Sequence, residues 1–296
     1  LIKNHKIDFA HFNYYLPLFL SKKCRYIVTI HDVLFIDFPQ YFPIKYRLIN
    51  TFLFKRSAIK AEILTTVSKY SAGRIRSNFN IEDKSITVLP NAIDEIYKQD
   101  YNKAEDRELI KNKYQIENFI IYVSRIEPSK NHSKLIQAYR ELRLWEQGLS
   151  LVLIGKESFI DLELKQLIAK VNQDSNGKLY QFDNITNSKL IAFYNAAQIA
   201  VFPSLCEGFG IPPIESAALK TPTICSNSTA MKEFDFFEDN LIDATSKESI
   251  KLKMVEALDM TNNNEFIYKV SEIVRNKYCW QHTANILKEL IINDKE

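Results

Sequence analysis

Short apolar runs that alternate with helix-length amphipathic segments are the feature that most constrains the fold of this chain. Ile, Val and Leu dominate these runs, as they do in strands that helices cover on both faces. We therefore predict an α/β protein built from strand-helix-strand units with parallel sheets. The expected strands lie at 7–12 and in the segments CRYIVTIHD, AEILTTVS, SITVLPN, FIIYVSR, LSLVLIG, KLYQF, IAVFPS and TPTICS.

A domain boundary is expected near residues 97–117, where the strand pattern gives way to a polar, charge-rich stretch. A new series of strands then begins at Phe119. We predict an N-terminal domain over residues 1–103, a C-terminal domain over 104–275 and a terminal segment over 276–296. The first series has fewer strands than the second, which indicates that the N-terminal domain is partial.

The composition excludes several classes of protein. No apolar run approaches the roughly 18–20 residues of a membrane-spanning helix, and no signal peptide is recognisable at the start of the sequence. The four cysteines are far apart and form no CxxC pair, which favours reduced thiols over disulfides or zinc. We therefore expect a cytoplasmic protein.

Charge is distributed unevenly along the sequence. The net charge is +7 up to Lys103 and −4 beyond it. A basic half can bind nucleic acid, a membrane surface or an anionic substrate. Because the sequence lacks the dense Arg/Lys clusters and motifs of nucleic-acid-binding proteins, we expect an anionic lipid surface and no nucleic acid as the partner.

The segment EGFGIPPIESAALK, which follows the expected strand IAVF, holds two of the six glycines of the chain. Ligands of parallel sheets bind in loops beyond the carboxyl ends of the strands. Gly208 and Gly210 allow backbone N–H groups to approach a ligand, and the prolines that follow suit the first turn of a helix. The segment predicts either an anion-binding loop or a tight turn whose carboxylates offset the helix dipole.

Two cations follow another expected strand in SRIEPSKN. Arg125 and Lys130 are five positions apart in a loop that leads into a helix. Each alone is typical of a solvated surface charge, but together they suit a diphosphate. With Glu207 and Glu215 near the same sheet edge, they predict a site for a sugar nucleotide, with cations for the phosphates and carboxylates for hydroxyl groups.

The sequence resembles the retaining, Leloir-type glycosyltransferases of family 4, which have the GT-B fold. The resemblance extends over essentially the whole chain and rests on four motifs: the two glutamates separated by seven residues in EGFGIPPIE, SRIEPSKN, TVSKYSAGRI followed by ITVLPNAID, and VTIHD. It implies two Rossmann-like domains that face each other across a cleft. It also implies that the last segment is a helix packing back on the N-terminal domain, and that this domain here lacks the first strand and glycine-rich loop of the family.

The same resemblance implies a role for each site residue. Arg125 and Lys130 would bind the diphosphate and stabilise charge on the leaving nucleotide. Glu207 would bind sugar hydroxyls, Glu215 ribose hydroxyls, and His31 would face sugar and acceptor. The implied donor site comprises Ser124, Arg125, Lys130, Glu207, Gly208, Phe209, Gly210, Ile211 and Glu215, and the catalytic residues are His31, Arg125, Lys130 and Glu207.

We expect no metal and no cofactor other than the donor itself. In the family the leaving phosphate accepts the proton of the acceptor. The sequence contains no Asp-x-Asp motif, and Arg and Lys can neutralise the charge that a divalent ion would otherwise neutralise. Cys206, beside the site, is interpreted as a packing residue and not as a nucleophile.

The acceptor would bind the basic first domain. Residues 41–62 mix aromatic and aliphatic side chains with five Lys/Arg, a pattern of interfacial amphipathic helices and also of core helices with a basic face. The first alternative predicts peripheral attachment to the cytoplasmic face of the inner membrane.

The predicted function is transfer of a hexose, mannose-like or an N-acetylhexosamine, from GDP-mannose or a UDP-sugar to a glycan or polyprenyl-linked acceptor. The setting implied is polysaccharide, lipopolysaccharide or O-antigen biosynthesis in bacteria. Alternatives are a GT-B epimerase or phosphorylase, and a non-catalytic nucleotide-sugar-binding subunit.

Overall fold

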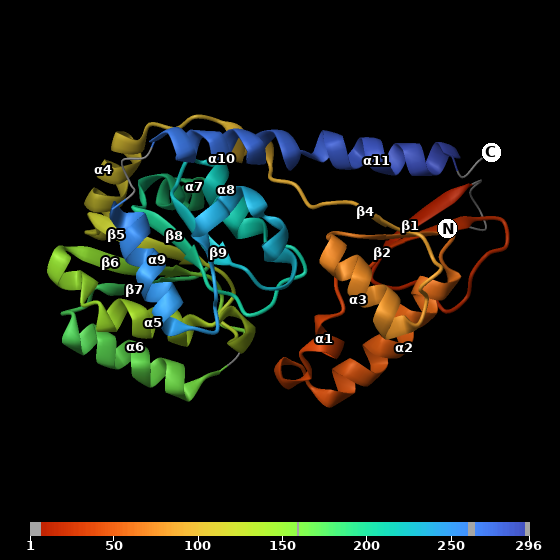
Figure 1. Cartoon of the computed structure of the whole chain (residues 1–296), viewed down its shortest axis with the longest axis horizontal. Coiled ribbons are helices and arrows are strands. Elements are labelled where there is room, and N and C mark those ends of the chain that lie inside the picture. The colour runs from red at the N-terminus through yellow and green to blue at the C-terminus, as the bar shows by residue number, and fades with distance from the viewer. Residues whose placement is uncertain (1–6, 159, 260–263, 294–296) are drawn as a thin grey trace. The chain divides into compact units, whose positions relative to one another are not determined.

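The structure is a computed structural model that describes residues 7–158, 160–259 and 264–293 (Figure 1). The chain divides into two compact units. Unit 1 comprises Leu1–Ala92, Cys206–Phe209 and Trp280–Glu296, and unit 2 comprises Ile93–Leu205 and Gly210–Cys279. The first continuous segment of unit 1 therefore ends earlier than the expected boundary at residue 103.

Unit 1 is built on a parallel sheet with the strand order β1-β2-β3-β4. The strands are β1 (Phe9–Asn13), β2 (Arg25–Thr29), β3 (Ile63–Thr66) and β4 (Ile86–Val88). The helices are α1 (Leu34–Asp37), α2 (Ile44–Lys60), α3 (Lys69–Phe79) and α11 (Trp280–Asn293). Thr283 Oγ1 of α11 donates to the carbonyl of Pro90 at 2.7 Å, which fastens this helix to the end of the β4 segment.

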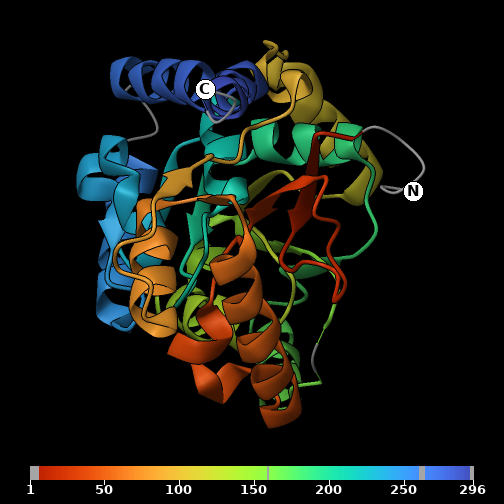
Figure 2. The ribbon, with the colours of Figure 1, turned by 90° about the vertical axis from the view of Figure 1, so that its right-hand side faces the viewer.

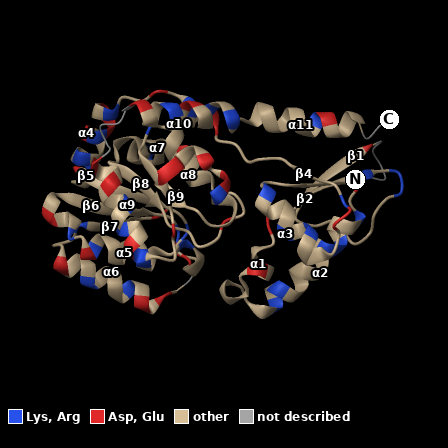
Figure 3. Ribbon diagram, viewed as in Figure 1, with Lys and Arg blue, Asp and Glu red and all other residues tan. Residues whose placement is uncertain are grey.

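Local sequence explains where the helices of unit 1 begin and end. Ser68 precedes α3 and its Oγ accepts from the N–H of Ser71 at 3.1 Å, a standard N-cap. Asn80 ends the helix in the left-handed conformation that Asn tolerates. Figure 2 gives a second view of α2 and α3 (orange), and Figure 3 marks in blue the Lys and Arg positions along both helices.

Unit 2 is a doubly wound parallel sheet with the strand order β10-β9-β8-β5-β6-β7. The strands are β5 (Asn118–Val123), β6 (Leu149–Ile154), β7 (Leu179–Phe182), β8 (Ile199–Phe202), β9 (Thr223–Ser226) and β10 (Leu241–Ile242). The helices are α4 (Lys103–Tyr114), α5 (His132–Glu141), α6 (Leu162–Asp174), α7 (Asn187–Ala196), α8 (Ile211–Ala218), α9 (Lys247–Asp259) and α10 (Asn264–Lys277).

The predicted α/β class with parallel sheets is confirmed, and every expected strand is present. The sequence did not reveal β10, because a strand of two residues has no apolar run to mark it. β5 and β8 are neighbours at the centre of the second sheet, where β5 is also the point at which the strand order changes direction. The loops that follow these two strands therefore lie together at the carboxyl edge, where ligands of such sheets bind.

Candidate functional site

The loop between β5 and α5 carries the two predicted phosphate-binding cations. The Arg125 side chain is 67% exposed, whereas that of Lys130 is 12% exposed. The carboxylate of Glu127 lies between them, 3.6 Å from Arg125 Nη2 and 3.8 Å from Lys130 Nζ. The structure thus adds to the predicted set Glu127, the carboxylate that lies near both cations.

Backbone contacts fix the start of this loop. Gly155, which follows β6, has a φ of +152°, and a Cβ at this position would lie 1.9 Å from the carbonyl oxygen of Ser124. The N–H of Ser124 in turn donates to Ile154 at 2.9 Å. The two strand ends approach so closely that only glycine fits, and this approach sets the direction in which the chain leaves β5 toward Arg125.

Hydrogen bonds join this loop to the loop that follows β8. The N–H of Leu205 donates to the carbonyl of Ser129 at 2.8 Å. The buried amide of Asn131 donates to Pro203 O at 3.1 Å and to Ala244 O at 2.8 Å. Tyr122 Oη, at the core of the sheet, donates to the carbonyl of Lys130 at 2.6 Å. These hydrogen bonds hold the loop of residues 124–131, called the cation loop below, against the segment that leads to α8.

The start of α8 lies at the same edge. Gly210 caps the helix with a φ of +104°, and a Cβ there would lie 2.9 Å from Met231 Cγ, so glycine is required. The first turn then contains Pro212 and Pro213, which have no N–H. Of the helical N–H groups that normally stay unpaired at a helix start, the first turn of α8 therefore offers that of Ile211.

Glu215, the predicted ribose ligand, lies half-buried on α8. Burial raises the pKa of its carboxyl to about 7. A hydrogen bond with Tyr97 opposes this rise in pKa, the charge of Asp94 adds to it, and Tyr194 lowers it again. The Tyr194 hydroxyl is close enough to Glu215 to affect its pKa. Within the described residues, however, this hydroxyl forms no hydrogen bond.

Four predicted site residues belong to unit 1. They are His31, Glu207, Gly208 and Phe209. His31 follows β2, and its ring stacks on that of Tyr14 with centroids 4.9 Å apart. Burial, and secondarily the charge of His11, lowers the pKa of His31, which favours a neutral imidazole at neutral pH.

The serines of the TVSKYSAGRI motif contact the loop that follows β8 at residues 207–210, called the glycine loop below. Both contacts are to Gly208, which belongs to unit 1. Ser68 Oγ and Ser71 Oγ donate to the carbonyl of Gly208 at 2.8 and 3.3 Å. A Cβ on residue 208 would lie 2.6 Å from Asp32 Oδ2, so glycine is required here by close approach. Cys206 is buried beside this loop, as its interpretation as a packing residue predicts.

The predicted donor residues thus fall into two sets. Unit 2 holds Ser124, Arg125, Lys130, Gly210, Ile211 and Glu215, on loops that follow β5 and β8 or on α8 itself. His132, at the start of α5, was not predicted, yet it is buried, its Nε2 lies 3.3 Å from Ser124 Oγ and its Nδ1 has no described partner. Burial lowers the pKa of His132 to about 4, so it is a neutral neighbour of the cation loop.

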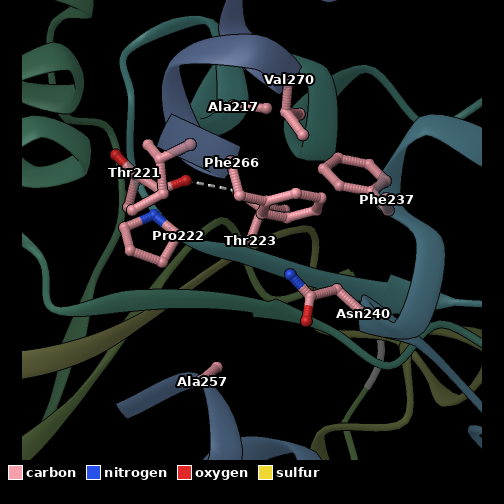
Figure 4. A pocket seen from close by; sticks show the side chains of 10 residues that line it. Ala217, Thr221, Pro222, Thr223, Phe237, Asn240, Ala257, Phe266 and Val270 are labelled. Atoms are coloured by element: carbon pink, nitrogen blue, oxygen red, sulfur yellow. Dashed lines mark hydrogen bonds between the residues drawn. The ribbon is translucent and has the colours of Figure 1, made fainter. Parts of the chain in front are cut away.

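A separate small cavity lies beneath α10, away from the predicted site residues. Phe237, Phe266 and Val270 border it, and its volume of about 20 Å³ admits little more than one water molecule (Figure 4). Thr223 Oγ1 closes one side by donating to Thr221 O at 2.8 Å. Within the described residues, no group of three or more His, Cys, Asp or Glu is placed to hold a metal ion.

This chain is similar to known proteins in sequence and, separately, in fold. The chain is 29% identical over 236 residues to the serotype-specific mannosyltransferase WbdA of Escherichia coli, covering 78% of this chain and 28% of WbdA. It is 26% identical to the O-antigen chain mannosyltransferase B of the same organism, covering 91% and 70%. The chain therefore spans less than a third of WbdA. The solved structure of sucrose-phosphate synthase from Thermosynechococcus elongatus superposes with a TM-score of 0.77 at 20% identity, covering 97% of this chain and 73% of that one.

The predicted GT-B fold is confirmed by this likeness. Two family models match the sequence in succession. The model described as Glycosyltransferase Family 4 matches residues 1–96. The model described as Glycosyl transferases group 1 matches residues 81–272, which include the cation loop, the glycine loop and α8. The chain belongs to the glycosyl transferases group 1 family.

Proposed function

We propose that this chain transfers a hexose, mannose in the first instance, from a nucleoside-diphosphate sugar to a glycan or polyprenyl-linked acceptor in polysaccharide assembly, with retention of anomeric configuration. The single observation that carries the proposal is that hydrogen bonds from Leu205 to Ser129 and from Asn131 to Pro203 join the β5 and β8 loops. These hydrogen bonds hold two cations next to the start of a helix, where a backbone N–H can bind phosphate oxygens. The names of the two Escherichia coli relatives support mannose as the sugar.

The proposed division of labour follows from charge and burial. Lys130, the less exposed cation, would contact the diphosphate from a fixed position, while the exposed Arg125 would swing from Glu127 onto it. Glu215 would accept a hydrogen bond from a ribose hydroxyl, at a carboxyl whose pKa burial raises to about 7. By resemblance, Glu207 and His31 contact the donor sugar.

The chemical step proposed needs no protein base. The bond between the anomeric carbon and the phosphate oxygen breaks, the acceptor oxygen bonds to the anomeric carbon on the same face, and the departing phosphate takes the acceptor proton. Arg125, Lys130 and the N–H of Ile211 would stabilise the negative charge that grows on the diphosphate. We propose that these cations serve without a divalent metal.

Attachment to an anionic membrane is proposed for unit 1. No helix among the described residues has the length and apolar character to cross a bilayer. On α2, however, Ile44, Leu48 and Phe52 recur every fourth residue, which places them on one face, and they are 65–70% exposed. Phe19, in the β1–β2 segment, is 93% exposed. Exposed apolar side chains on a helix that also carries Lys and Arg suit the interface of an anionic leaflet (Figure 3).

The transfer proposal is tested with the purified chain, GDP-mannose and other sugar nucleotides, and polyprenyl-diphosphate-linked glycan acceptors, with and without EDTA. We expect a glycosylated product in which NMR shows the anomeric configuration of the donor, at an unchanged rate in EDTA. Glu207→Ala should reduce transfer more than it reduces affinity for free GDP. Product of inverted configuration would contradict the retaining mechanism, whereas nucleotide binding without any product would favour a non-catalytic subunit.

The membrane proposal is tested separately by vesicle flotation. Vesicles containing phosphatidylglycerol should retain the protein at low salt, and neutral phosphatidylcholine vesicles should not. Phe52→Ser removes an exposed apolar side chain and should weaken retention, while Leu252→Ser, at an exposed position on α9, serves as the control. Equal retention of both variants would show that α2 is not the contact.

A further inference from the structure

A second polar pocket opens at the opposite edge of the unit 2 sheet. Its volume is about 480 Å³, within the range of small-molecule sites. Gln198 and Pro222 line it, and they directly precede the strands β8 and β9. The pocket therefore lies at the amino ends of the strands, whereas the cation loop and α8 begin at their carboxyl ends.

Four cations and one acid line this pocket. Lys220 Nζ and Arg275 Nη2 share the carboxylate of Asp100, at 2.7 and 3.0 Å. Lys103 and Arg107 stand one turn apart on α4, and no described carboxylate forms an ion pair with either. Arg107 makes only a long contact, from Nε to the carbonyl of Ala196 at 3.5 Å. The wall of α4 thus presents two positive charges that form no ion pair within the described residues.

Lys103 is partly buried in this wall. Burial, and then the charge of Arg107, lowers its pKa to about 8. An ammonium group that is desolvated beside a second cation is destabilised until an anion joins it. The charges on α4 are therefore arranged as they would be in an anion site.

Polar groups that suit a sugar lie around the cations. The amide nitrogens of Asn195 and Gln198 donate to Asp106 at 2.8 Å and to Asn118 at 3.0 Å. The amide oxygens of both side chains enter no hydrogen bond within the described residues and can accept from hydroxyl groups. The half-exposed ring of Tyr268, with Lys220 Nζ 4.8 Å from its centroid, also lines the pocket.

We propose that this pocket binds an anionic saccharide, with Lys103 and Arg107 holding its phosphate or carboxylate and with Asn195, Gln198 and Tyr268 holding its sugar ring. The site is distinct from the donor site because it lies at the other sheet edge and shares no residue with it. The proposal does not depend on the proposed transfer reaction.

Calorimetric titration of the full chain tests this site. Glucose 6-phosphate and glucuronate should bind, each more tightly than glucose and than inorganic phosphate. Lys103→Met keeps an unbranched side chain one atom shorter and removes the charge, and Arg107→Gln removes the second charge. Each should weaken binding of glucose 6-phosphate about tenfold, the usual scale of a charge-assisted hydrogen bond. The control is Lys113→Met, on the same helix but outside the pocket, and it should leave binding unchanged.

Folding and site identity are checked in the same series. Lys103→Met should melt at or above the wild-type temperature without ligand, because it removes an unpaired, partly buried charge. Lys130→Ala should leave glucose 6-phosphate affinity unchanged. The proposal is overturned if Lys130→Ala abolishes that binding while Lys103→Met does not, or if inorganic phosphate binds as tightly as the sugar phosphate.

Discussion

At the scale of single residues, Gly155 is the position where local geometry most directly controls the site. Ala at 155 would place a Cβ 1.9 Å from Ser124 O and force the start of the cation loop to move. Gly177 is a matched control, since its φ of +79° also strains other residues but no atom lies within 4 Å of an added Cβ. We expect Gly155→Ala to destabilise the fold by about 1–3 kcal/mol more than Gly177→Ala. Chemical denaturation measures the difference, and equal losses would contradict the close approach.

Glu215 gives a prediction about pH. Its folded-state pKa of about 7 lies above the usual value of 4.5, so the folded state holds the proton more tightly than the unfolded state. Wild-type stability from this group is therefore present below pH 4.5 and is lost as pH rises toward 7. Glu215→Gln lacks this loss, so its melting temperature relative to wild type should increase between pH 5 and pH 8.

The control for this measurement is Glu108→Gln, at an exposed position on α4. Thermal melts of the three proteins at matched ionic strength provide the comparison. A difference between Glu215→Gln and wild type that stays constant from pH 5 to pH 8 would show that burial does not hold the proton on Glu215.

At the scale of elements, Asn131 is the main connection between the cation loop and its neighbours. Its amide donates to Pro203 and Ala244, and its φ of 60° is one that glycine adopts without strain. Asn131→Gly thus removes the hydrogen bonds and keeps the backbone. We expect a loss of about 1–3 kcal/mol in unfolding free energy because two buried carbonyls lose their donor. Asn184→Gly, at an exposed position with a φ of 48°, is the control, and a similar loss there would contradict this role for Asn131.

The sequence predicted the elements better than the contacts between them. Apolar runs located the strands, and the glycines and prolines of EGFGIPPIE located the loop and the start of α8, since both signals are local. Glu127 was missed as the partner of both cations because ion pairing depends on how a loop folds. Tyr97 was missed beside Glu215 because the two are far apart in the sequence.

At the scale of the whole molecule, the proposed transfer requires unit 2 to bind the nucleotide sugar. The topology brings the β5 and β8 loops together whatever the surrounding chain adds, since both strands are central in one parallel sheet. Periodicity could predict the fold class but not the strand order, which sets this juxtaposition. The residues that discriminate one base or sugar from another are not marked by any sequence pattern, so the donor must be identified by measurement.

The most direct test is calorimetric titration of GDP, UDP and ADP into wild type, Lys130→Ala, Arg125→Ala and the control Arg143→Ala, whose exposed side chain pairs with Glu146 outside the site. We expect at least one nucleoside diphosphate to bind the wild type and the control equally. Each site variant should lose affinity about tenfold or more, with the larger loss for the less exposed Lys130. Equal affinity of wild type and Lys130→Ala for every nucleotide that binds would contradict the assignment of the diphosphate site.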